Sequence, residues 1–388
     1  MRAIPLVVLA ALCCSAAVAE PVLTPLLVTG RGGFGVPGAT ALSFNSLRLD
    51  PTGGVAARVI LDGAGIDFDN NVAVLAGTGG PMSVVAREGD PVPGVAGATF
   101  TNVFALTVAG DVAGVLGRFS GPGVTAADDE ALWRYDAGAP TLLARSNEVV
   151  PGGTTERFTA FDQIAIDGAG NATVVAATTA SNRFRQAIYT DRTGTLQPVF
   201  RLGDPVPGTG NKTADLIGAL EPAPDSDRVF WAELDSSQSF VDFQSDEVLV
   251  RERNGQLSLV LREGVAAPGA PGFEFGEIGG LNGIGGFRPL GGGRIGLRLD
   301  LRPAFGSADE SAWAFDNGAL SLLARTGDVV DGRVVNRVST PEWISGDSWL
   351  IDVSVDGTDD AVLRSDAGTL STVLATGDAM PDSADTFD

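Results

Sequence analysis

The sequence predicts an all-β protein, specifically a β-propeller of six four-stranded blades. Three observations support this prediction: a ten-residue phrase recurs along the chain, a hairpin pattern precedes most copies, and glycine and proline are abundant, at 52 and 22 residues. Repetition every few tens of residues is typical of solenoids and propellers. Four-stranded antiparallel units repeated about six times around a channel describe a propeller.

The repeated phrase is clearest at residues 85–94, VAREGDPVPG. Its copies are LARSNEVVPG (143–152), VFRLGDPVPG (199–208), VLREGVAAPG (260–269), LARTGDVVDG (323–332) and VLATGDAMPD (373–382), with a worn copy near residue 26. The copies divide the chain into about six repeats of about 58 residues. Glycine, proline and aspartate favour turns, so the phrase is expected to connect the last strand of one repeat to the first strand of the next.

A hairpin pattern precedes most copies of the phrase. Residues 247–262 and 311–325 show it best, with Asn254-Gly255 and Asn317-Gly318 as two-residue turns that suit a type I′ hairpin. Two weaker strands lie upstream of each hairpin, as at residues 161–166 and 171–177. Each repeat is therefore expected to contribute four strands.

Both faces of the hairpin strands carry apolar residues. Trp313 and Phe315 alternate with Ala312 and Ala314, as expected for sheets that neighbours cover on both sides. Because no linker separates the repeats, residues 20–388 are predicted to form one propeller domain. The alternatives are a linear β-solenoid and a string of sandwiches.

The amino terminus predicts export. Arg2 precedes an apolar run at residues 4–12, and Ala17-Val18-Ala19 has the small-x-small pattern of a signal peptidase site. Residues 1–19 are therefore expected to be a signal peptide, which places the mature protein in the periplasm, at the cell surface or in the medium. No later run approaches the length of a membrane span, so no transmembrane segment is expected in the mature chain.

Two segments resemble the NxxGxxAF pattern of the bacterial choice-of-anchor tandem-repeat proteins. They are DPTGGVAA at residues 50–57 and DGAGNATV at residues 167–174, with Asp in place of the first Asn. The resemblance implies an exported surface protein of unknown activity, and it carries over no catalytic residue. Such proteins often end in an anchoring segment, and residues 385–388 show no apolar tail or basic cluster by which one could be recognised.

Composition excludes several functions. The net charge is −22 and the pI is about 4.3, so nucleic acid would be repelled. Histidine is absent, which excludes Ser-His-Asp triads and histidine metal sites. The protein is therefore expected not to be an enzyme of these classes, and the balance favours no enzymatic activity.

One cluster of oxygen-bearing side chains could hold calcium. Asp67, Asp69 and Asn71 lie in the segment DFDNN, and hard cations prefer carboxylate and amide oxygens. The same residue types also favour turns. The sequence thus predicts either a turn without a cofactor or a calcium site.

Acidic residues recur at the start of the third strand of several repeats. In a hairpin with a two-residue turn and regular pairing, the numbers of facing residues add to a constant. This rule predicts three cross-strand ion pairs, Glu130–Arg145, Glu247–Arg262 and Glu310–Arg325. The alternative is an acidic rim that binds cations or a basic partner.

Two function hypotheses follow. The first is a binding or structural scaffold whose loops between the second and third strands contact a protein or a glycan, with Phe240, Phe243 and Phe305 as candidate contacts. The second is a carboxylate-dependent, glycan-active hydrolase with its site at the channel mouth. For the hydrolase, Asp162 and Glu277 are the only plausible acids on the first strands.

Overall fold

The computed structural model describes residues 29–32, 34–50, 53–78, 82–179, 186–235, 245–276, 278, 286–303, 308–357 and 359–378. These residues form β-strands joined by turns, and none of them is in an α-helix. Within the same ranges no helical segment has the length and hydropathy needed to cross a bilayer. The prediction of an all-β fold is confirmed. The predicted signal peptide lies outside the described residues.

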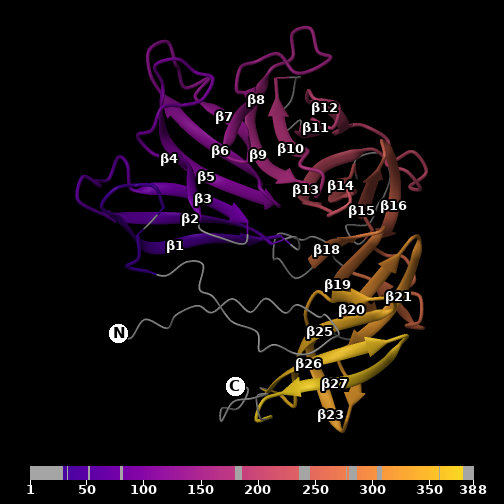
Figure 1. Cartoon of the computed structure of the whole chain (residues 1–388). Coiled ribbons are helices and arrows are strands. Elements are labelled where there is room, and N and C mark those ends of the chain that lie inside the picture. Colours follow the sequence, from indigo (N-terminus) through magenta and orange to yellow (C-terminus); the bar gives the residue numbers. More distant parts are fainter. Residues whose placement is uncertain are drawn as a thin grey trace. The chain divides into compact units, whose positions relative to one another are not determined.

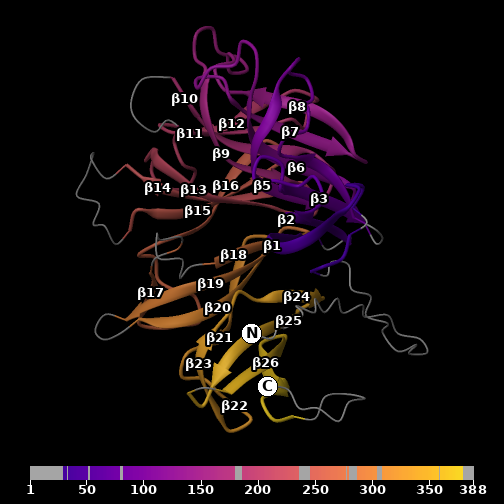
Figure 2. The ribbon, with the colours of Figure 1, turned by 90° about the vertical axis from the view of Figure 1, so that its left-hand side faces the viewer.

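The strands form six antiparallel sheets in the described residues, and each sheet is built from consecutive strands of the chain (Figures 1 and 2). The first sheet contains β1 (Ala39–Leu49), β2 (Gly54–Gly63), β3 (Val72–Thr78) and β4 (Ser83–Arg87). The second contains β5 (Thr99–Ala109), β6 (Val112–Ser120), β7 (Glu130–Asp136) and β8 (Ala139–Arg145). The third contains β9 (Phe158–Ile166), β10 (Ala172–Thr178), β11 (Gln186–Thr190) and β12 (Gln197–Arg201).

The fourth to sixth sheets follow the same order. The fourth contains β13 (Ala214–Pro222), β14 (Arg228–Leu234), β15 (Glu247–Arg253) and β16 (Gln256–Arg262). The fifth contains β17 (Phe273–Phe275), β18 (Gly286–Gly291), β19 (Arg294–Pro303), β20 (Asp309–Asp316) and β21 (Ala319–Arg325). The sixth contains β22 (Val329–Val330), β23 (Arg333–Val338), β24 (Glu342–Ser345), β25 (Ser348–Val355), β26 (Asp359–Asp366) and β27 (Thr369–Ala375).

In the last two sheets the first strand is split. Strands β17 and β18 both pair with β19, and β23 and β24 both pair with β25. All six sheets therefore share one plan of four successive antiparallel positions, which is the blade plan of a β-propeller. The fold is an all-β propeller fold. Contacts divide the chain into two compact units, residues 1–166 with 194–196 and residues 167–193 with 197–388; a single ring of six blades stays a prediction.

Consecutive sheets share apolar clusters. In the first unit, the buried Phe100 and Trp133 of the second sheet pack in one cluster with Val74 of the first. In the second unit, Trp313 of β20 packs with residues of the fourth sheet, whereas Ala312 packs with residues of the sixth. Strand β20 is thus buried on both faces, as the alternation of its apolar residues predicts.

Every sheet has a β-bulge at the same place, between its third and fourth strands. The register shifts by one residue near Val74, Leu132, Ile188, Leu249, Ala312 and Val362. In each case the unpaired residue is the first of the repeated phrase: Val85, Leu143, Val199, Val260, Leu323 and Val373. A bulge adds one residue to one strand and displaces all later pairs.

The repeated phrase forms a capped turn. In four copies the side chain of the sixth residue accepts a hydrogen bond from the backbone N–H of the residue three positions earlier, as Asp204 does from Arg201 (2.8 Å) and Asp328 from Arg325 (2.9 Å). The backbone N–H of Gly89, the fifth residue of its phrase, then donates to the carbonyl of Phe100 on the next sheet (2.8 Å). The predicted role of the phrase as a connecting turn is confirmed.

Candidate functional site

The predicted ion pairs between glutamate and arginine are wrong, because the bulge adds a residue that the constant-sum rule does not include. The actual partners across the strands are Arg145 with Ala131, Arg262 with Val248 and Arg325 with Ser311. A shift of one residue moves a side chain to the other face of the sheet. Glu130, Glu247 and Glu310 therefore do not face Arg145, Arg262 and Arg325.

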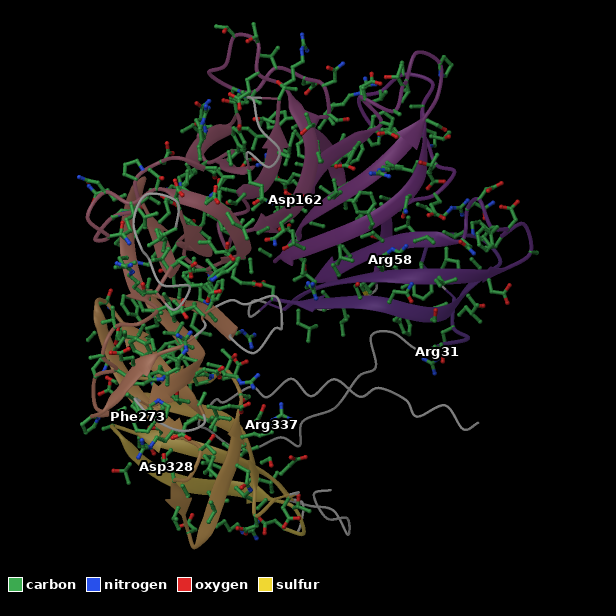
Figure 3. The ribbon with its side chains drawn as sticks, turned by 180° about the vertical axis from the view of Figure 1, so that it is seen from behind. Arg31, Arg58, Asp162, Phe273, Asp328 and Arg337 are labelled. Atoms are coloured by element: carbon green, nitrogen blue, oxygen red, sulfur yellow. The ribbon has the colours of Figure 1, made fainter. Side chains whose placement is uncertain are left out.

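The three arginines have other partners. Arg145 pairs with Asp128 (Nη2 to Oδ2, 2.6 Å) and lies 5.1 Å from the centre of the Phe119 ring. Arg325 lies over Phe273 at 5.3 Å and has its Nε 3.7 Å from Asp328; Phe273 and Asp328 are labelled in Figure 3. Arg262 donates from its Nε to the carbonyl of Ser245 (2.9 Å). Two of the three arginines thus cover aromatic rings.

The glutamates connect consecutive sheets. In four sheets, a side chain at the first or second residue of the third strand position accepts a hydrogen bond from a backbone N–H near the start of the following sheet. We call this contact the backbone latch. The donor and acceptor pairs are Phe161 to Glu130 (2.8 Å), Ile217 to Gln186 (3.3 Å), Ile278 to Glu247, and Val338 to Glu310 (3.3 Å). Strands β9 and β13 are edge strands, so the latch satisfies N–H groups that face away from their own sheet.

The first sheet uses a different bond. The position that begins its third strand is Val72, which has no side-chain acceptor. Instead, Arg58 of β2 donates from its Nε to the carbonyl of Val103 on β5 (2.6 Å), and Arg58 is labelled in Figure 3. Here the side chain of the first sheet donates and the backbone of the second sheet accepts, which is the reverse of the latch.

In two of the latches an arginine balances the carboxylate charge. Arg118 has its Nε 3.2 Å from Glu130 Oε2, and Arg298 has its Nη2 2.7 Å from Glu310 Oε1. The other oxygen of each carboxylate accepts the latch bond. Both carboxylates are therefore engaged on both oxygens.

We expect a double-mutant cycle on Glu310 and Arg298 to give a coupling energy of about 0.2–1 kcal/mol, the range for partly exposed pairs. The same cycle on Glu310 and Arg325 should give none, because these side chains lie on opposite faces. Urea denaturation of Glu310→Gln, Arg298→Met, Arg325→Met and both double variants measures these energies. A coupling energy between Glu310 and Arg325 larger than that between Glu310 and Arg298 would show that the two strands pair without the bulge.

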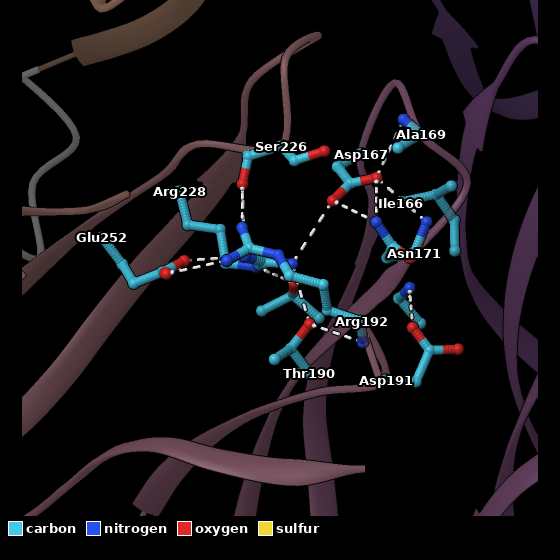
Figure 4. A network of polar contacts seen from close by, with 12 residues as sticks. Ile166, Asp167, Ala169, Asn171, Thr190, Asp191, Arg192, Ser226, Arg228 and Glu252 are labelled. Atoms are coloured by element: carbon cyan, nitrogen blue, oxygen red, sulfur yellow. Dashed lines mark hydrogen bonds and ion pairs between the residues drawn. The ribbon is translucent and has the colours of Figure 1, made fainter. Parts of the chain in front are cut away.

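Arg228, at the start of β14, is the largest polar side chain among the fully buried ones in the described residues. Its side chain is 0% exposed and its guanidinium contacts two carboxylates, Glu252 Oε2 at 2.7 Å and Asp167 Oδ2 at 3.3 Å. Thr190 Oγ1 also accepts a bond from Nη2 (2.8 Å), and Thr173 Oγ1 accepts one from Nε. Figure 4 shows Arg228 between Glu252 and Asp167.

A second arginine completes this network. Arg192 binds Glu252 Oε1 (3.1 Å) and the carbonyl of Ser226 (2.6 Å). Asp167 also accepts bonds at Oδ1 from the N–H groups of Ala169 and Asn171 (3.0 and 2.9 Å). Two arginines and two carboxylates thus form a neutral group that joins the third and fourth sheets. Sequence reasoning missed it, and the only sequence signal is a charged residue that opens the apolar run of β14.

Glu233 lies among carboxylates that repel its negative charge. Glu233 of β14 lies directly opposite Glu247 of β15. Burial raises the pKa of Glu233, and the charges of Asp246, Glu247 and Asp215 raise it further. Burial also raises the pKa of Glu263, while Arg302 pairs with that carboxylate and lowers it. A carboxyl with a raised pKa beside an ionised carboxylate is the arrangement of a general acid.

The predicted calcium residues lie in one turn. Asp67 Oδ1 accepts the N–H of Asp69 (3.1 Å), and the carbonyl of Asn71 accepts the N–H of Leu61 (2.7 Å). Among the residues that the structure describes, no group of three or more acidic side chains is arranged to hold a metal ion. The turn is observed, and calcium binding stays a prediction.

Of the remaining candidates for catalysis or binding, the structure describes only Asp162. Asp162 on β9 is exposed and labelled in Figure 3. Glu277, Phe240, Phe243 and Phe305 lie outside the described residues. Catalysis by Asp162 and Glu277 and binding through the three phenylalanines stay predictions.

A family model described as a family of unknown function (DUF7453) matches residues 24–287. No curated protein matches the chain. The resemblance to choice-of-anchor repeat proteins is not tested by this match and stays a prediction.

Several solved structures are similar at low identity. They include the β-propeller domain of the Trilobed protease from Pyrococcus furiosus (10% identity, 88% of this chain, 84% of that chain, TM-score 0.47), an acylaminoacyl peptidase from Pyrococcus horikoshii (9%, 86%, 46%, 0.44) and an oligogalacturonate lyase from Vibrio parahaemolyticus (11%, 89%, 75%, 0.39). The chain spans less than half of the peptidase. At these identities and TM-scores the similarity says nothing about activity.

Proposed function

The chain belongs to the family of unknown function DUF7453, and we propose that it is an exported β-propeller scaffold that binds a partner at the cell surface or in the periplasm without catalysing a reaction. The amino-terminal signal pattern supports export. The single observation that carries the proposal is the backbone latch, which commits the recurring acidic side chains to the fold.

A catalytic carboxylate has to exchange a proton with substrate or attack it, so it needs an oxygen that is not already occupied. Glu130 and Glu310 each use one oxygen on a backbone N–H and the other on an arginine. Arg228 occupies one oxygen of each of Asp167 and Glu252 in the same way. The loops between second and third strands, held on these linked sheets, are suited to binding.

A specific observation favours a second candidate, a carboxylate-dependent glycan hydrolase. Glu233 has a raised pKa and faces Glu247, and glycoside hydrolysis needs one protonated and one ionised carboxyl group. Glu247 Oε2, however, accepts the N–H of Ile278. The hydrolase therefore requires Glu247 to act through its other oxygen.

Glu233→Gln distinguishes the two candidates. As a scaffold, the protein should hydrolyse none of a panel of neutral and acidic polysaccharides, and Glu233→Gln should raise the free energy of unfolding at pH 7 by about 0.2–1 kcal/mol, because like charges directly opposite destabilise a sheet. Since the pKa of Glu233 is raised on folding, the wild type loses stability as pH rises through that pKa. The difference between the two proteins should therefore vanish below pH 4.5, the ordinary value.

The control is Glu274→Gln, since Glu274 is exposed on β17. Reducing-sugar release by the wild type that persists in Glu274→Gln and is abolished in Glu233→Gln would overturn the scaffold proposal in favour of the hydrolase. Urea denaturation at each pH supplies the stability values.

A further inference from the structure

The turn between β2 and β3 presents an aromatic side chain to solvent. Phe68 is 90% exposed, more than the other exposed large apolar residues of the described chain, such as Leu42 (59%) and Val329 (66%). An aromatic side chain is a large apolar surface, and it is typically buried on folding or on binding. Folding leaves Phe68 unburied.

The turn that carries Phe68 is held by its own hydrogen bonds. Asn70 Oδ1 accepts the N–H of Asp67 (3.1 Å), and Asn70 Nδ2 donates to the carbonyl of Gly65 (3.3 Å). At its base Ile66 packs against the core of the first sheet. The backbone that carries Phe68 is therefore held in place by the turn before any partner arrives, which lowers the entropic cost of ordering the loop on binding.

The charge around Phe68 is negative. Asp67 and Asp69 flank it and are both exposed. Neither has an ion-pair partner among the described residues. The chain as a whole carries a net charge of −22, so a second copy of this chain or another acidic protein would be repelled.

We propose that Phe68 is the apolar anchor of a docking site for a protein whose binding surface is apolar at its centre and rimmed by lysine and arginine. This inference rests on the proposed binding function and names the class of partner. Phe68 would fill the apolar centre, while Asp67 and Asp69 pair with the basic rim. Aromatic side chains that enter such pockets carry much of the energy of an interface, and the charges mainly set association rate and specificity.

The probe is an amphipathic peptide of alternating lysine and leucine, compared with its glutamate and leucine counterpart by isothermal titration. We expect the lysine peptide to bind the full chain and the glutamate peptide not to bind. Phe68→Ser should weaken binding at least about tenfold, and the double variant D67N and D69N should weaken it with a smaller dependence on salt. The matched control is Leu42→Ser, which removes another exposed apolar side chain and should bind as the wild type does.

The melting curve of Phe68→Ser should match that of the wild type, because the side chain of Phe68 is 90% exposed. Equal binding by Phe68→Ser and wild type, or binding of both peptides or neither, would overturn the proposal. If Phe68→Ser abolished the binding of a glycan, the partner would be a carbohydrate and not a protein of the proposed class. If sedimentation velocity showed self-association that depends on Phe68, the partner would be a second copy of this chain. Each of these outcomes differs from the polysaccharide hydrolysis that would overturn the scaffold itself.

Discussion

Replacing Arg228 with methionine is expected to lower the free energy of unfolding by about 3–5 kcal/mol, because removal of one member of a buried ion pair leaves uncompensated charge in the interior. Arg228 is 0% exposed and contacts the carboxylates of Asp167 and Glu252. Arg192 can still pair with Glu252, whereas Asp167 loses the guanidinium that pairs with it. Urea denaturation followed by tryptophan fluorescence measures the change.

The matched control is Arg253→Met. Arg253 is the last residue of β15 and contacts Asp227 at 3.4 Å, but its side chain is 41% exposed. Pairs of this kind contribute about 0.2–1 kcal/mol, so this variant should lose no more than that. Equal losses in the two variants would show that Arg228 is not buried in an ion pair.

Removal of one backbone latch should have the second largest effect. We expect Glu130→Ala to lower the free energy of unfolding by about 1.5–3 kcal/mol, since it leaves the buried N–H of Phe161 without an acceptor and removes a charged hydrogen bond. The bond is 2.8 Å long, and Glu130 is only 6% exposed. Thermal and urea denaturation at neutral pH measure the loss.

Glu130→Gln is the control, because an amide oxygen can accept the same bond. The chain itself shows this at Gln186, which accepts the N–H of Ile217. Glu130→Gln should therefore lose distinctly less stability than Glu130→Ala, with the remainder due to the lost contact with Arg118. If the two variants lose the same free energy of unfolding, the stabilisation comes from the charge of Glu130 and not from its hydrogen bond to Phe161.

Local patterns in the sequence were sufficient for the strands and turns. Asn254 and Asn317 adopt positive φ, at 53° and 47°, as a type I′ hairpin requires. The alternation of Trp313 with Ala312 correctly indicated a sheet covered on both faces. These features depend on residues close in sequence, which periodicity and turn chemistry can read.

Contacts between distant residues could not be predicted in the same way. The bulge in each sheet shifts register by one residue, and it leaves no mark in a hairpin whose turn is otherwise regular. Asp167 and Arg228 are 61 residues apart, and Glu130 and Phe161 are 31 apart. Their pairing depends on how one sheet packs on the next, so the recurrence of acidic residues was visible while their partners were not.

Residue-resolved amide hydrogen exchange tests the central claim, that these side chains serve the fold by linking consecutive sheets. In the wild type, the N–H groups of Phe161, Ile217 and Val338 should exchange slowly, as buried hydrogen-bonded amides do. In Glu130→Ala, exchange at Phe161 should accelerate while Ile217 and Val338 stay protected. Unchanged protection at Phe161 in Glu130→Ala would contradict the account, because that amide would then have another acceptor and Glu130 would be available for a different function.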